Sequence, residues 1–232
     1  MTTHSIVSRR KWIEARKKLL AKEKEFTRLR DQLSAERREL PWVKVEKEYI
    51  FDGIEGKQSL SDLFNGKNQL MIYHFMLGPE WEEGCPSCSF WADNFNGIDI
   101  HLAHRDISFL AISRAEIKKI EAYKKRMGWN FKWVSSRNND FNNDYCVSFT
   151  PEEKEMNEIT YNYLTQPYFM DELAGVSVFI KSEENNIYHT YSTYSRGLDI
   201  LNGAYNYIDL SPKGRDEKDG IMKWLRRHDQ YE

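Results

Sequence analysis

The sequence predicts an α/β fold in which a mixed β-sheet is flanked by helices. Two nearly continuous apolar runs, residues 69–77 and 107–112, have the length of strands buried on both faces. Helical patterns separate and follow these runs, and strands that alternate with helices pair in parallel. An antiparallel hairpin expected near the C-terminal end makes the predicted sheet a mixed one.

The segment before the first apolar run predicts a long helix and the start of the sheet. Residues 8–39 contain no Gly or Pro and are rich in strong helix formers, so we expect one helix that ends before Pro41. Residues 43–51 predict a strand that reverses at Asp52 and Gly53. Residues 59–64 predict a short helix capped by a serine.

Later elements complete one domain. A helix is expected from Pro86, an amphipathic helix over residues 114–127 and a short strand over 131–134, whereas residues 137–172 show no clear period and predict an irregular insertion. The hairpin pairs residues 176–181 with 187–193, and residues 198–207 and 220–228 predict closing helices. We therefore expect an N-terminal helical extension over residues 1–40 and a domain over 41–232 that contains the insertion.

Composition limits the class of protein. The chain has 232 residues, a net charge of −2 and three cysteines, too few for a disulfide scaffold. The first ten residues lack the apolar core of a secretory signal, and no stretch approaches the roughly 18 apolar residues of a membrane span. We expect a soluble cytoplasmic protein that does not bind a membrane.

The first 50 residues are basic, with 14 Lys or Arg against 8 Asp or Glu. Interspersed acidic residues would repel phosphates along the same surface, so we do not expect nucleic-acid binding. Apolar residues recur every seven positions, but the companion positions are only half apolar. The helix therefore either packs along its own domain or serves as a homodimer arm; the apolar positions are Trp12, Leu19, Phe26, Leu33 and Leu40.

The feature that indicates chemistry is Cys85-Pro86-Ser87-Cys88, which follows the first apolar run. If the run is a strand and a helix begins at Pro86, free backbone N–H groups point at the Cys85 sulfur and favour its thiolate. Cys85 would then attack a substrate disulfide, and a buried Cys88 one turn later would resolve the mixed disulfide. The substrate would be a protein or small-molecule thiol or disulfide, with no cofactor.

Acidic residues upstream of the pair act against this activation. Glu80, Glu82 and Glu83 would oppose the ionisation of Cys85 by like charge, so only a modest lowering of its pKa is expected.

A zinc site and a purely structural role are the alternatives to redox chemistry for the two thiols. His101 and His104 follow Cys88 at a spacing close to that of a zinc finger. In a continuous helix the rise alone would place His101 roughly 20 Å from Cys88, too far to share an ion. A helix break at Gly97 would restore this alternative, in which the protein binds a metal or a partner without catalysis.

Three further residues are candidates for supporting roles. His74 lies inside the predicted strand, where a core histidine is favoured over a proton shuttle for the thiols. Trp81 either lines a substrate groove or packs in the core. Arg114 follows the second strand, at the sheet edge where ligands bind, or else is a surface charge at a helix start.

The stretch from Tyr73 to Ser89, YHFMLGPEWEEGCPSCS, resembles the signature of the DUF899 family, which consists of thioredoxin-like predicted dithiol–disulfide oxidoreductases. The similarity extends over nearly the whole chain, including residues 12–20, 36–41, 113–115, 126–129, 134–136 and 191–209. It implies a thioredoxin-like mixed sheet flanked by helices, with the cysteine pair at the start of the central helix and family-specific elements at both ends.

Two departures from better-known relatives bear on function. Thioredoxins place a Pro before the strand that faces the cysteine pair, whereas Ala174 and Gly175 stand there in this chain. Peroxiredoxins carry Thr or Ser three residues before the peroxidatic Cys, whereas Glu82 holds that position. A peroxiredoxin-like thiol peroxidase is therefore the second candidate enzyme.

Overall fold

The computed structural model describes residues 4–232, which divide into two compact units after Pro41. The first unit is the predicted long helix, α1 (Arg9–Arg38). Ser8 begins it, because the Ser8 hydroxyl accepts a hydrogen bond from the backbone N–H of Lys11. No residue of α1 is buried.

The second unit is built on a mixed sheet of eight strands, in the order β1-β10-β9-β4-β5-β6-β2-β3. Its strands are β1 (Val43–Lys44), β2 (Ile50–Gly53), β3 (Gly56–Ser59), β4 (Gln69–His74), β5 (Ile107–Ser113), β6 (Lys132–Ser135), β9 (Gly175–Lys181) and β10 (Ile187–Tyr194). The central strands β4, β5 and β6 are parallel, and the β9–β10 hairpin pairs antiparallel to β4. The expected mixed sheet and hairpin are therefore confirmed.

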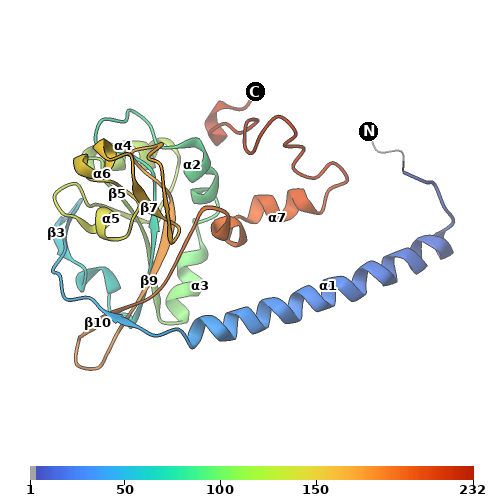
Figure 1. The fold of residues 1–232 in the computed structure, drawn as a ribbon, viewed down its shortest axis with the longest axis horizontal. Helices are drawn as coiled ribbons and strands as arrows, with labels where there is room; N and C mark the ends of the chain where they lie inside the picture. Colours follow the sequence, from blue (N-terminus) through green and yellow to red (C-terminus); the bar gives the residue numbers. More distant parts are fainter. Residues whose placement is uncertain (1–3) are drawn as a thin grey trace. The chain divides into compact units, whose positions relative to one another are not determined.

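Helices cover both faces of this sheet (Figure 1). The remaining elements of the sheet domain outside the insertion are η1 (Asp62–Phe64), α2 (Pro86–Ala92), α3 (Ile98–His104), α4 (Ile117–Arg126), η2 (Ser195–Leu201), α7 (Gly203–Asp209) and η3 (His228–Gln230). The crossovers from β4 to β5 and from β5 to β6 proceed in the same direction across the sheet, and α2, α3 and α4 contribute to one hydrophobic core on the same face. The hydrophobic core of that face surrounds Cys88, whereas η1 packs into a second core on the opposite face.

The order β10-β9-β4-β5, with the cysteine pair at the start of the helix after β4, is the thioredoxin-like arrangement that the family resemblance implied. Because side chains alternate along a strand, Tyr73 of β4 faces α2 while Ile72 and His74 face the opposite core.

The predicted irregular insertion contains short regular elements. They are α5 (Phe141–Asp144), α6 (Pro151–Glu155), β7 (Ile159–Tyr161) and β8 (Leu164–Gln166), with β7 and β8 paired antiparallel. A small third core, which includes Val147, Phe149 and Tyr194, joins the insertion to β10. The expected insertion is thus mostly irregular, and its regular elements escaped the sequence pattern because segments of three to five residues are too short to show a hydrophobic period.

The helix expected over residues 220–228 is wrong, because residues 221–224 form turns, residues 225–227 have no regular structure and only η3 follows. Gly220 and Met222 have positive φ angles of 125° and 59°, which a right-handed helix does not allow. The carboxylate of Glu217 accepts hydrogen bonds from the backbone N–H of Met222 and the indole of Trp224. These local bonds replace the helical ones.

Along the described part of the chain, residues 4–232, none of the helices combines the length and apolar character needed to cross a membrane.

Candidate functional site

Cys85 stands at the N-cap of α2, and Pro86 occupies the first helical position as predicted. The Cys85 backbone is fixed on both sides. Its N–H donates to the carbonyl of Met76 at 3.0 Å, and its carbonyl accepts from the hydroxyl of Ser89 at 2.8 Å. The segment just after β4 and the first turn of α2 therefore hold this residue in place.

The Cys85 thiol is arranged to ionise. Its pKa is lowered to about 6, chiefly by a hydrogen bond from the Cys88 thiol, and further by the Ser87 hydroxyl and the backbone N–H groups of Ser87 and Cys88; burial opposes these contributions. The Ser87 oxygen lies 3.0 Å from the Cys85 sulfur. At neutral pH Cys85 is therefore mostly thiolate, the nucleophilic form.

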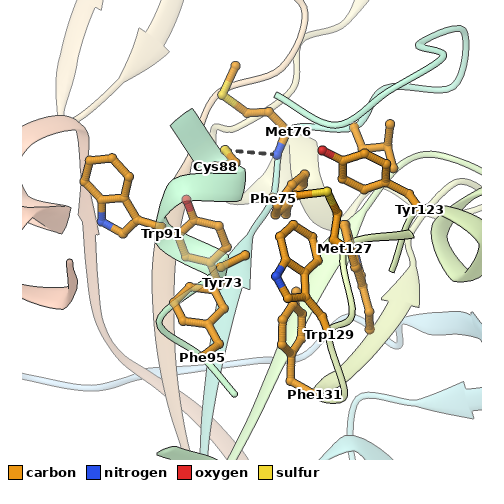
Figure 2. Close-up of a cluster of buried hydrophobic side chains, with 14 of the residues drawn as sticks. Tyr73, Phe75, Met76, Cys88, Trp91, Phe95, Tyr123, Met127, Trp129 and Phe131 are labelled. Atoms are coloured by element: carbon orange, nitrogen blue, oxygen red, sulfur yellow. Dashed lines mark hydrogen bonds between the residues drawn. The ribbon is translucent and has the colours of Figure 1, made fainter. Parts of the chain in front are cut away.

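The pKa of Cys88 is shifted in the opposite direction. It is 1% exposed, and burial together with the Cys85 charge raises its pKa well above the ordinary value. The backbone N–H of Met76 donates to its sulfur at 3.5 Å, and the Tyr73 hydroxyl points toward it (Figure 2). The two thiols are free rather than bonded to each other, as is Cys146. One thiol is thus ready to attack, and its partner holds a proton.

The upstream glutamates do not oppose this activation as expected. Glu83 pairs with Arg126 and with Arg227, whose Nη1 lies 2.7 Å from it. Glu82 is 92% exposed, with Lys119 at 3.9 Å. Because arginines and solvent compensate these charges, the expectation of a modest pKa shift at Cys85 is wrong.

A second set of residues, which the sequence pattern does not mark, holds the loop before Cys85. Arg227 donates from Nη2 to the Gly84 carbonyl at 2.7 Å and from Nε to the Tyr123 hydroxyl at 3.0 Å. Tyr123 lies 2.9 Å from the Ser89 hydroxyl, which donates to the Cys85 carbonyl. A Cβ on Gly84 would stand 2.5 Å from the Tyr123 ring, so only glycine fits.

A cavity of about 240 Å³ opens beside the thiol pair. Ser87 and Cys88 line it on one side, and Leu198 and Met222 from the C-terminal segment line it on the other. Sequence reasoning missed this cavity, because its walls lie about a hundred residues apart in the chain. Ala174, noted at the position where thioredoxins carry Pro, is one of its wall residues.

The structure does not bring His74 to the thiols. The ring of His74 is 1% exposed, lies in the opposite core and is hydrogen-bonded to Ser177 at 2.8 Å. Burial lowers its pKa to about 3, so this histidine is neutral, in keeping with the favoured core interpretation.

Arg114 and Trp81 lie at the same sheet edge. Arg114 pairs at 3.3 Å with Glu172, a carboxylate that is 2% exposed and that sequence reasoning did not single out. Burial raises the pKa of Glu172 to about 7. Trp81 packs partly buried against the core that contains Cys88, and its carbonyl accepts from Lys119.

The segment from Pro86 to His104 is not one helix: α2 ends at Ala92, and Gly97, with φ 88°, is the N-cap of α3. His101 and His104 are exposed on α3, whereas Cys88 is buried. Across residues 4–232, no three His, Cys, Asp or Glu side chains are grouped so that they could hold a metal ion. The geometry thus gives the zinc alternative no support.

Solved structures with similar folds include peroxidoxin BcpB from Mycobacterium tuberculosis, which is 12% identical with a TM-score of 0.45, over 73% of this chain and 97% of that one. PrxQ from Xylella fastidiosa, solved as a mutant, is 13% identical with a TM-score of 0.44, over 72% and 95%. Peroxiredoxin Q from Xanthomonas campestris is 15% identical with a TM-score of 0.45, over 67% and 87%. These similarities are too distant to bear on activity.

No curated protein matches the chain. The family model described as "Bacterial protein of unknown function (DUF899)" matches residues 1–231, nearly the whole sequence. The match agrees with the resemblance carried by the residues around the cysteine pair. The chain therefore belongs to the DUF899 family.

Proposed function

We propose that the protein is a thiol–disulfide oxidoreductase in which Cys85 is the nucleophile and Cys88 the resolving thiol. The observation that carries this proposal is the opposite ionisation of two neighbouring thiols. The pKa of Cys85 is lowered to about 6, and that of the buried Cys88 is raised. A purely structural pair would not require such a difference.

In the proposed reaction the Cys85 thiolate attacks one sulfur of a substrate disulfide. The substrate S–S bond breaks, the first thiolate leaves, and Cys85 holds the other half as a mixed disulfide. Cys88 then gives up its proton and attacks the Cys85 sulfur, which releases the second substrate thiol. The substrate gains two electrons, and the protein is left with a Cys85–Cys88 disulfide.

The surroundings support both steps. The Cys88 thiol, the Ser87 hydroxyl and the backbone N–H groups stabilise the thiolate before attack. When the mixed disulfide forms, Cys85 loses its charge and no longer raises the pKa of Cys88, so that Cys88 ionises more readily for the second step. The substrate is a protein or small-molecule disulfide, in a reducing cytoplasmic setting that returns the pair to dithiol.

Disulfide reduction by the wild type, Cys85→Ser and Cys88→Ser tests the proposal, with dithiothreitol as the final reductant and insulin as substrate. We expect both variants to lose the activity and Cys88→Ser to accumulate a mixed disulfide at Cys85. Equal rates in the three proteins would exclude the mechanism.

The same preparations, assayed with hydrogen peroxide, separate the alternative enzyme. A thiol peroxidase would consume peroxide faster than any disulfide and would form a sulfenic acid at Cys85 in Cys88→Ser.

A further inference from the structure

We propose that the cavity beside Cys88 binds one half of an uncharged, apolar disulfide and thereby selects the substrate class; this inference rests on the proposed function. The cavity is close to the nucleophile, mostly apolar in its walls and balanced in charge at its rim. Each of these properties follows from contacts in the second unit.

The cavity begins at the thiols. Its lining includes the Tyr73 ring, Ser87 and Cys88. Cys85 is not among the lining residues, but Ser87 is, and its hydroxyl oxygen lies 3.0 Å from the Cys85 sulfur. A disulfide with one half in the cavity therefore has its sulfur atoms beside Ser87, within reach of the Cys85 thiolate.

Apolar side chains form the rest of the inner wall, including Trp91, Ala174 and Leu198. The volume of about 240 Å³ exceeds the roughly 150 Å³ of an engineered apolar cavity that takes up benzene. A single aromatic ring or a short apolar chain therefore fits.

The outer wall is a fixed part of the fold. In the segment that forms it, the Leu198 carbonyl accepts a hydrogen bond from the Trp91 indole at 2.8 Å. The Tyr205 ring packs edge-on against Trp91 and Phe90 at 5.8 and 5.1 Å. Figure 1 shows this orange-to-red segment on the same side of the sheet as α2. The cavity is thus formed without a ligand, which reduces the entropic cost of binding.

The rim carries charges that cancel. Two arginines and two carboxylates line the cavity: Arg196, Asp199, Arg215 and Glu217. Asp199 accepts from Arg196 at 2.9 Å and from Arg215 at 3.1 Å. Both guanidinium groups therefore already have a carboxylate partner, and neither is set aside for a carboxylate on the substrate.

Glu217 makes the rim unfavourable for anions. Its carboxylate accepts from the Tyr205 hydroxyl at 2.7 Å, the Met222 backbone at 2.9 Å and the Trp224 indole at 3.1 Å. These hydrogen bonds lower its pKa even though burial opposes them, so it remains charged at neutral pH. A negatively charged disulfide would meet this carboxylate, whereas an uncharged one would not.

Two aromatic disulfides of similar shape test the inference. 4,4′-Dithiodipyridine is uncharged at neutral pH, 5,5′-dithiobis(2-nitrobenzoate) carries two carboxylates, and each releases a coloured thiol. Mixed with pre-reduced protein, each disulfide takes two electrons from the dithiol pair and yields two thiols. For the protein, the rate with the uncharged reagent is divided by the rate with the anionic reagent. This ratio is then divided by the same ratio measured with dithiothreitol alone in place of the protein, which removes the difference in intrinsic reactivity between the two reagents. We expect a value of about tenfold or more, equivalent to ~1.4 kcal/mol.

Ala174→Leu should fill the cavity and lower the rate with the uncharged reagent about tenfold, while the anionic reagent changes little. Ala122→Leu adds the same side chain at an exposed position of α4 and should leave both rates unchanged. A normalised ratio near one in the wild type, or equal rates in Ala174→Leu and wild type, overturns the inference.

Calorimetry with 1,2-di(4-pyridyl)ethane, which has the rings but no sulfur, measures occupancy of the cavity without redox chemistry. We expect the wild type to bind it and Ala174→Leu not to. Disulfide reduction without such binding would overturn the cavity inference and leave the oxidoreductase standing. Binding that Ala174→Leu abolishes, in a protein that reduces no disulfide, would overturn the proposed function and leave an apolar ligand site.

Discussion

Arg227 and Gly84 are joined by two hydrogen bonds, from Nε at 3.1 Å and Nη2 at 2.7 Å to the Gly84 carbonyl. Gly84 is the residue before the nucleophile, so a side chain near the C-terminal end of the chain fixes the approach to Cys85. The same guanidinium neutralises Glu83. Arg227 is therefore a positioning residue for the thiol, which it does not touch.

Arg227→Gln should raise the pKa of Cys85 by about half a unit, since Glu83 loses one of its two partners and the loop loses an anchor. At a pH equal to the pKa of Cys85 in Cys88→Ser, the alkylation rate of Cys88→Ser/Arg227→Gln should then be about half that of Cys88→Ser. Iodoacetamide alkylation of pre-reduced Cys88→Ser and Cys88→Ser/Arg227→Gln, followed against pH, gives both pKa values.

Arg226→Gln is the control, because the Arg226 side chain donates to the nearby backbone carbonyls of Lys223 and Leu225. It should leave the pH profile of alkylation unchanged. A shift of the same size in both arginine variants would mean that Arg227 acts only through net charge.

Ser87→Ala tests the hydrogen bond at 3.0 Å between the Ser87 hydroxyl and the Cys85 sulfur. Loss of a donor to the thiolate should raise the pKa of Cys85 from about 6 by roughly half to one unit. Thiolate absorbance at 240 nm during a pH titration measures the change. An unaltered midpoint would show that the Cys88 thiol and the backbone suffice, and a serine exchanged far from the site, Ser211→Ala, controls for general effects.

Local patterns made the thiol pair predictable. Cys85, Pro86, Ser87 and Cys88 are adjacent in sequence, and the strand and helix around them have clear apolar periods. The contacts of Arg227 with Gly84 and the packing of Leu198 against Trp91 span about a hundred residues or more, and no periodicity encodes them. The sequence shows the glutamates next to Cys85 but not the arginines that pair with them. For this reason the pKa of Cys85 is lowered more than the sequence predicts.

The paired strands and long helix were predictable for the same reason, whereas the end of the chain was not. Residues 220–228 have the composition of a helix, yet Met222 and Leu225 pack inward from a chain of turns. Hydrogen bonds to Glu217 and Gly84 determine that path. Tertiary contacts thus overrode local propensity where the cavity and the active-site loop are completed.

Besides Cys85, Glu172 is a second group that titrates near neutral pH, and its titration changes the free energy of unfolding. It is 2% exposed, accepts from Ser148 at 2.5 Å and pairs with Arg114. Its folded pKa of about 7 lies above the ordinary 4.5, so the neutral carboxyl stabilises the fold. That contribution is complete below pH 4.5 and is lost as the pH rises through about 7.

Glu172→Gln keeps the neutral form at every pH. Relative to this variant, the wild type should lose about 3 kcal/mol in the free energy of unfolding between pH 4.5 and 8. Urea unfolding at several pH values measures the difference. Asp62→Asn is the control: hydrogen bonds from Ser59 lower the pKa of Asp62 from its ordinary 3.8, so its difference from wild type should stay nearly flat over this range. A flat difference for Glu172→Gln as well would contradict the assignment.

The exposed apolar stripe of α1 predicts that the chain forms a homodimer through this helix. Exposed apolar side chains recur on this helix every seven residues, at Trp12, Leu19, Phe26 and Leu33. A second copy of the helix would cover this stripe. The double variant Phe26→Glu/Leu33→Glu should convert a dimer into a monomer in light scattering, because charges would meet at the interface. Thr27→Glu, beside the stripe, should remain dimeric. A monomeric wild type at all concentrations would rule out the dimer arm.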